Sequence, residues 1–136
     1  MQEPPEEMRR EFIENWQFTE EGSCLEALRK IEERLHEYVS DQEAEGEIAR
    51  DAEAEDVLAM VEAWAGLMSY VVLETYGQHS AMRHAGWYAD VPLRLRRMCG
   101  RLRGPLRWVA SNMGALDFSI GVSFPGGVSV SLSWTP

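Results

Sequence analysis

The segment from Gln78 to Val91 carries most of the side chains in this sequence that could perform chemistry. Within ten residues it holds two imidazoles, a hydroxyl, a guanidinium and two aromatic rings, at His79, Ser80, Arg83, His84, Trp87 and Tyr88. An imidazole serves as a general base or a metal ligand, and aromatic rings line small-molecule pockets. These residue types suggest a catalytic centre or a ligand pocket.

The spacing of these residues argues against catalysis and against a metal site. His79 and His84 are five residues apart, so a helix would place them on different faces, and no Cys, Asp or Glu lies nearby at ligand spacing. Ser80 lacks the sequence motif of a nucleophilic serine turn. We therefore expect no enzyme activity, no metal and no cofactor. The segment is interpreted as a helix and turn over the core, and a pocket lined by His79, His84, Trp87 and Tyr88 is the alternative.

The next stretch places arginines on both sides of an apolar helical stripe. The stripe comprises Val91, Leu95, Met98, Cys99 and Leu102. Arg94, Arg97 and Arg101 flank one side of it, and Arg96 and Arg103 flank the other. These arginines either pair with acidic residues of the same chain or bind an acidic partner.

The overall charge argues against nucleic acid as the partner of these arginines. The chain has a net charge of −10, which repels phosphate, and it shows no RNA-binding or helix-turn-helix pattern. Residues 1–62 hold 20 acidic and 6 basic side chains, whereas residues 63–136 hold 3 and 7. The two halves should attract each other, within one chain or between two copies.

The acidic stretch from Asp41 to Asp56 is the remaining candidate for metal binding. It lacks the alternating Asp or Asn residues, the central Gly and the closing Glu of a calcium loop. We interpret it as a helical extension or an acidic loop, with no metal.

The cysteines and the first residues indicate a compartment. Cys24 and Cys99 are too few for a disulfide framework, and the start, MQEPPEEMRR, lacks the apolar core of a signal peptide. We expect a cytoplasmic protein of one domain, because 136 residues suffice for a single core.

A helix from Val57 to Tyr76 must position everything else. It is apolar nearly all round, with charge only at Glu62 and Glu74, which is typical of a buried helix. Its length also suits a membrane span, but Glu62 leaves too short an apolar run and the preceding residues are acidic. Its narrow stripe of small and polar residues could accept a neighbouring helix or a second copy.

Shorter helical segments surround this one. Pro4 and Pro5 open the first helix, and a capping box of Ser23 and Glu26 predicts the start of a second helix that ends near Ser40. After the arginine-flanked helix, Gly104-Pro105 predicts an interruption, followed by a last helical piece that ends at Gly114.

At the C-terminal end the period of the apolar residues changes from 3.6 to 2. Phe118 to Phe124 and Val128 to Trp134 alternate apolar residues with Ser or Gly on either side of a Pro-Gly-Gly turn, which predicts a β-hairpin. Each strand is too short to span a membrane. The face that carries Ser129, Ser131 and Ser133 has no charge, and no Lys or Pro protects the edges of the strands.

These patterns together predict an α+β, mostly α, fold: a bundle of four or five helices in residues 1–114 with a β-hairpin in residues 115–136. The expected function is non-catalytic protein binding, as a small acidic adaptor, accessory or immunity-like protein. The expected contact residues are Arg94, Arg97, Arg101, Ser129, Ser131 and Ser133. The partner would be a protein, with a homodimer as one form, and not nucleic acid or membrane. The alternative is a small-molecule-binding or regulatory domain with its pocket near residues 79–88.

Overall fold

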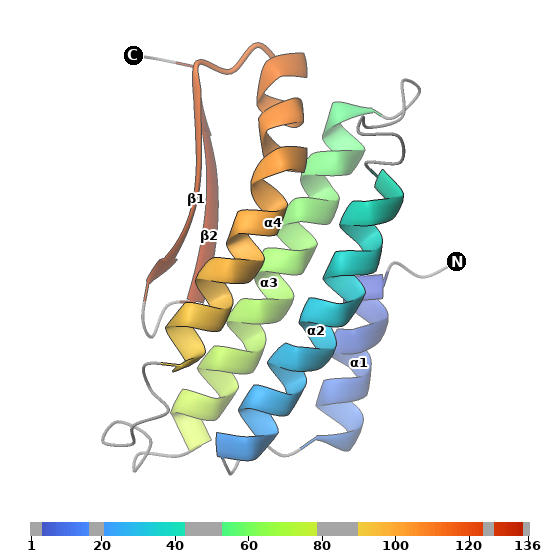
Figure 1. The fold of residues 1–136 in the computed structure, drawn as a ribbon, viewed down its shortest axis with the longest axis vertical. Coiled ribbons are helices and arrows are strands. Elements are labelled where there is room, and N and C mark those ends of the chain that lie inside the picture. The colour runs from blue at the N-terminus through green and yellow to red at the C-terminus, as the bar shows by residue number, and fades with distance from the viewer. Residues whose placement is uncertain (1–3, 17–20, 43–52, 79–89, 124–126, 135–136) are drawn as a thin grey trace.

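The computed structural model describes residues 4–16, 21–42, 53–78, 90–123 and 127–134. These residues form four helices, α1 (Pro4–Asn15), α2 (Glu21–Gln42), α3 (Ala54–Gln78) and α4 (Asp90–Asn112). A hairpin of two antiparallel strands follows, β1 (Asp117–Ser123) and β2 (Gly127–Ser133) (Figure 1). The predicted α+β fold, with a helical bundle and a C-terminal hairpin, is confirmed.

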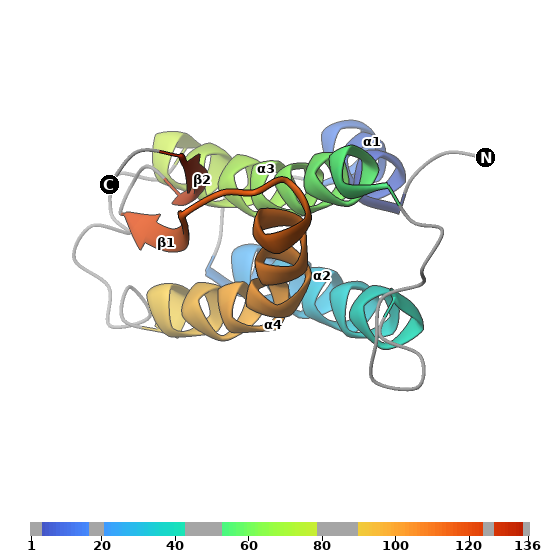
Figure 2. The same cartoon turned by 90° about the horizontal axis from the view of Figure 1, so that it is seen from above.

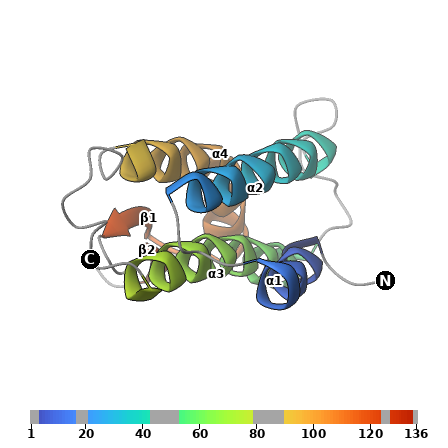
Figure 3. The same cartoon turned by 90° about the horizontal axis from the view of Figure 1, so that it is seen from below.

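The helices form two layers, and the hairpin runs along one edge of both layers. Successive helices run in opposite directions (Figure 1), α1 and α3 form one layer, and α2 and α4 form the other (Figures 2 and 3). Strand β1 packs on α4 and strand β2 packs on α3, so the hairpin bridges the two layers on the side away from α1.

Helix α3 is the centre of the core, as its apolar sequence predicts. The side chains of Val61, Trp64, Met68 and Val71 have no exposed surface. They meet apolar residues from the three other helices, including Phe12, Leu28, Ile31, Leu35, Leu95, Met98 and Leu102. The span from Ala54 to Glu74 is long and apolar enough to cross a membrane, with a mean hydropathy of 1.5, and here 44% of that window is buried inside the bundle.

Two predicted helix boundaries are wrong by a few residues. Helix α2 begins at Glu21, so Ser23 lies within its first turn and is not the N-cap. A glutamate at the first position suits the positive end of the helix dipole, and Gly22 does not prevent the start. Helix α3 extends beyond the predicted range of Val57 to Tyr76 at both ends, from Ala54 to Gln78.

Helix α4 contradicts the predicted interruption at Gly104-Pro105. It runs without a break from Asp90 to Asn112 with Pro105 inside it, and it changes direction in its C-terminal half (Figure 2). A proline inside a helix removes one hydrogen bond and clashes with the carbonyl four residues earlier, so it either bends the helix or ends it. Leu102, Leu106 and Val109 are fully buried on both sides of the bend, and this packing keeps the helix intact.

The register of the hairpin separates its two faces. Phe118 pairs with Leu132, Ile120 with Val130 and Val122 with Val128, and these six side chains face the helices. The opposite face holds Ser119, Gly121, Ser129, Ser131 and Ser133, and we call it the serine face. Trp134 ends the alternating run, but its side chain is 50% exposed and its indole N–H donates to the Met113 carbonyl at 3.1 Å.

Ser69 joins the hairpin to the central helix. Its hydroxyl oxygen accepts a hydrogen bond from the Val128 N–H at 2.9 Å, and it lies 3.1 Å from the Val128 carbonyl and 2.9 Å from that of Ala65. Gly127 permits this approach, because a Cβ there would lie 2.6 Å from the Ser69 hydroxyl oxygen. Its φ of 91° also favours glycine. The small stripe of α3 therefore meets a strand at Ser69, whereas Ala59, Glu62 and Gly66 of the same stripe are exposed.

Two glycines should respond in opposite directions to alanine substitution. Gly127→Ala should lower the free energy of unfolding by at least about 1 kcal/mol, because it combines a positive φ with a collision against Ser69. Gly66→Ala should raise it by about 0.5–1 kcal/mol, because Gly66 lies inside α3 with open space at its Cβ position. Urea titration of the two variants measures both changes. Equal effects would contradict the close contact of β2 with Ser69.

Truncation of the central aromatic ring should be among the most costly changes in this chain. Trp64 is fully buried, so Trp64→Ala should lower the free energy of unfolding by about 3–5 kcal/mol. The indole nitrogen of Trp64 has no hydrogen-bond partner in the described residues, so Trp64→Phe, which removes the N–H, should cost clearly less. A loss below about 1 kcal/mol for Trp64→Ala would contradict the central place of α3.

Candidate functional site

The aromatic and histidine-rich segment lies outside the described residues. His79, His84, Trp87 and Tyr88 fall between residues 78 and 90, so the ligand pocket near residues 79–88 stays a prediction. Residues 43–52 of the acidic stretch also lie outside. Among the ranges that the structure describes, no three His, Cys, Asp or Glu side chains come together around a metal-sized site.

Arg97 is engaged by an acidic residue of the neighbouring helix. Its Nε lies 2.8 Å from Oε1 of Glu32, and its Nη2 donates to Oε2 of Glu32 at the same distance. This two-point contact joins α4 to α2, and it raises the pKa of Arg97 through the hydrogen bond to Glu32. The geometry matches the expectation that this side of α4 pairs with the acidic half of the chain.

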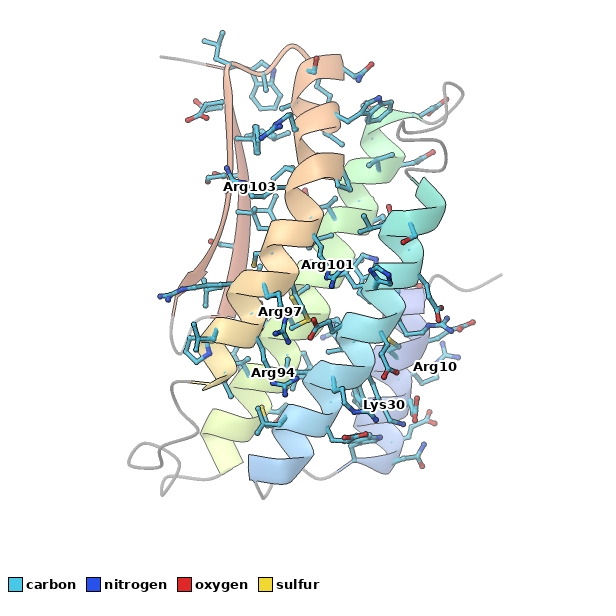
Figure 4. All side chains as sticks on the ribbon, in the orientation of Figure 1. Arg10, Lys30, Arg94, Arg97, Arg101 and Arg103 are labelled. Carbon is cyan, nitrogen blue, oxygen red and sulfur yellow. The ribbon has the colours of Figure 1, made fainter. Side chains whose placement is uncertain are left out.

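Arg101 and Arg94 lie on the same side of α4 as Arg97 (Figure 4). Nη1 of Arg101 lies 2.6 Å from Nδ1 of His36, and because a guanidinium only donates, the imidazole nitrogen accepts this hydrogen bond. Arg94 lines a shallow hollow of about 330 Å³ together with Leu25, Leu93 and Arg97. Of the three arginines predicted to bind a partner, Arg97 and Arg101 contact α2, and Arg94 is half-buried beside Leu25 of that helix.

A second set of arginines lies toward the hairpin. The guanidinium carbons of Arg103 and Arg107 lie 5.7 and 5.9 Å from the ring centre of Phe118 in β1. Arg96, two helical turns before Arg103, is exposed on the same side of α4. We call Arg96, Arg103 and Arg107 the arginine row. Their spacing of seven and four residues was visible in the sequence, but nothing there showed that β1 lies beside them.

The serine face contains the three serines predicted to bind a partner. Ser129 and Ser131 are exposed, and Ser133 is half-buried. The hydroxyl oxygens of Ser119 and Ser131 lie 2.6 Å apart across the two strands. The result is a small sheet surface of hydroxyl groups and glycine, with a carboxylate only at Asp117.

The two edges of the hairpin differ, although both were expected to be open. The Val128 N–H points away from β1 to Ser69, so α3 covers this end of the β2 edge. On the other strand, the Asp117 carboxylate accepts a hydrogen bond from the Phe118 N–H at 2.8 Å. The side chains of Ser69 and Asp117 therefore each accept a hydrogen bond from a backbone N–H at one end of an edge. No local sequence motif predicted these two contacts.

Other polar features of the described residues have structural roles. Arg29 of α2 forms ion pairs with Glu26 and Glu33 of the same helix, beside a hollow of about 530 Å³ between α1 and α2. Cys24 and Cys99 are free and buried, and burial raises the pKa of the Cys99 thiol to about 11. A thiol with this pKa is protonated at neutral pH and is a poor nucleophile.

Reversal of the charge of Arg97 tests its contact with Glu32. Arg97→Glu places a second carboxylate beside Glu32, so it should lower the melting temperature, with a larger effect at low salt. Glu32→Arg in the same chain should restore much of the loss, as a charge swap does for a direct pair. Arg96→Glu is the matched control, because Arg96 forms no ion pair with the described residues. A loss for Arg97→Glu that the swap leaves unchanged would contradict the contact.

Comparison with known proteins gives no relative from which a function could be transferred. No family model matches the chain, and no curated protein or solved structure is significantly similar to it. The hairpin and the adjoining side of α4 therefore form the candidate site on their geometry alone.

Proposed function

We propose that this protein is a non-catalytic protein-binding module, a small acidic adaptor, accessory or immunity-like protein whose hairpin is its contact surface. The observation that carries the proposal is the serine face, a small pleated surface that turns away from the helices. Its residues pair across the two strands, and its side chains are short.

Physical chemistry favours contact with another protein on such a face. Short hydroxyl side chains lose little rotamer entropy when they are buried, so a partner surface can approach at low cost. Their hydroxyl groups both donate and accept hydrogen bonds, as the close pair of Ser119 and Ser131 illustrates. A monomer gains little from a sheet face whose only charge is Asp117 in a chain with 26% charged residues.

A second copy of the chain is one partner that fits this face. Most of the serine face carries no charge, so two copies would meet there without the repulsion expected from a net charge of −10. Isologous dimers use the same patch on both subunits, and a flat sheet face suits that symmetry. Arg94, which pairs with no acidic residue in the described ranges, adds a positive charge on the α2 side of α4.

A lysine on the serine face tests the proposal. Ser131→Lys puts a long charged side chain where the partner would lie, while the apolar face of the hairpin stays unchanged. We expect the wild-type protein to sediment as a dimer or larger at micromolar concentration. Ser131→Lys should shift it toward monomer with little change in melting temperature.

Two controls separate surface effects from folding. Ser40→Lys adds the same charge at an exposed position of α2. Ser119→Ala removes the hydroxyl contact to Ser131 without adding charge. Ser40→Lys should sediment like the wild type, and Ser119→Ala should shift the protein toward monomer less than Ser131→Lys does, because it removes one hydroxyl of the face and adds no charge. A wild-type protein that is monomeric, and that binds no other protein through this face, would make the hairpin a cover of the core only.

A further inference from the structure

The outer edge of β1 is the backbone surface of the hairpin that faces away from α3. The Val128 N–H bonds to Ser69, so its pair with Val122 does not share hydrogen bonds between the strands. Because such pairs alternate along an antiparallel ladder, the N–H and C=O groups of Phe118, Ile120 and Val122 point outward. The bond from the Phe118 N–H to the Asp117 side chain agrees with this direction.

Two residues of this edge keep unused backbone groups. Asp117 satisfies the Phe118 N–H, but the outward groups of Ile120 and Val122 have no hydrogen-bond partner within the described ranges. Natural sheets usually protect an edge with charge, proline or a covering element. The segment from Phe118 to Val122 contains no charge and no proline, so this part of β1 is competent to pair with an added strand.

The arginine row lies beside this edge. Arg103 and Arg107 reach the ring of Phe118, whose side chain is on the helix-facing side of the hairpin. Arg103 points toward the hairpin in Figure 4, whereas Arg97 and Arg101 point toward α2. Helix α4 and β1 run in opposite directions (Figure 1), so Arg96 lies toward the Val122 end of the strand.

The charges of the row are not neutralised within the described part of the chain. Arg96, Arg103 and Arg107 form no ion pair there, whereas Glu32 of α2 holds Arg97 on the other side of α4. Gly100 lies between Arg96 and Arg103 on the exposed side of α4, with open space at its Cβ position. This side of α4 is therefore positively charged, has no side chain at Gly100, and lies next to the strand edge with unused backbone groups.

We propose that the outer edge of β1 accepts an extended acidic segment of a partner protein as a third strand. The main chain of that segment would bond to the outward groups of Ile120 and Val122, as in other complexes formed by strand addition. Side chains of a strand alternate between its faces, so acidic residues at every second position would meet the arginine row. This inference rests on the proposed protein-binding function and names the chemistry of the partner.

Charge complementarity and the strand edge together select this partner over other anions. A polyphosphate or an anionic membrane would use the arginines but has no use for the backbone groups of Ile120 and Val122. A second copy pairing edge to edge would use the backbone but would bring two arginine rows together. An acidic strand uses both features.

The test uses a fluorescein-labelled peptide of about ten residues that alternates Glu with Val, long enough to cover the edge. Fluorescence anisotropy with the full chain should show saturable binding of this peptide, and none of the matching peptide that alternates Lys with Val. Val122→Pro removes an outward N–H without breaking a bond between β1 and β2. It should weaken binding about tenfold relative to Val122→Ala, which loses the same packing but keeps the N–H.

The arginine row has its own matched pair of variants. Arg96→Gln with Arg107→Gln should weaken binding about tenfold, and more at low salt. Arg10→Gln with Arg34→Gln, at exposed positions of α1 and α2, changes the net charge equally and should alter binding less than about twofold. Circular dichroism melting of all four variants checks that the fold is retained.

Several results would overturn the inference. They are absence of saturable binding of the Glu peptide, equal affinities for Val122→Pro and Val122→Ala, or equal losses in the two double variants. Binding to phosphatidylserine vesicles that needs the arginines but is unchanged in Val122→Pro would show a general anion surface. The sedimentation of Ser131→Lys is independent of these measurements, so failure here and failure of the proposed function remain distinguishable.

Discussion

Helix α3 is apolar on nearly every side, and the need to remove it from water governs the whole arrangement. Burial of a large apolar side chain contributes about 1.5–3 kcal/mol, and α3 carries several that are completely covered, from Val61 to Val72. No single neighbour could cover them. Helix α1 lies along one side, α2 and α4 form the facing layer, and β2 covers part of the remaining side at Ser69. The hairpin is thus part of the core enclosure, because Ile120 of β1 belongs to the same apolar cluster as Trp64.

The arginines on the two sides of α4 lie in different surroundings. On the α2 side, Glu32 and His36 receive Arg97 and Arg101, and these contacts fix how the two helices lie in their layer. On the hairpin side, Arg103 and Arg107 lie over an aromatic ring, which leaves their charge able to attract a carboxylate. A chain with a net charge of −10 therefore presents a local positive surface next to a strand.

Periodicity was sufficient to predict the central helix, the hairpin and the apolar face of α4, because each pattern continues over many residues. Local signals failed where packing outweighed them. Pro105 bends α4 without ending it, since Leu102, Leu106 and Val109 hold both halves on one core. The candidate site was predicted only in part. The serines follow from strand alternation, but whether Arg97 or Arg103 faces outward depends on which elements pack on either side of α4, and one helix alone does not reveal that.

The contact between Ser69 and Val128 links residues that are 59 positions apart in the chain. During synthesis, all residues of the four helices have been added once residue 112 is made, whereas the strand that covers this side of α3 at Ser69 has not yet been synthesised. Until β2 arrives, part of the most apolar helix in the molecule is open to any nearby surface. Such exposed intermediates are prone to aggregate or to bind chaperones. The closing step of folding would then be the docking of the hairpin, so the rate of that step, and not the rate of helix formation, would determine how long a newly made chain is vulnerable.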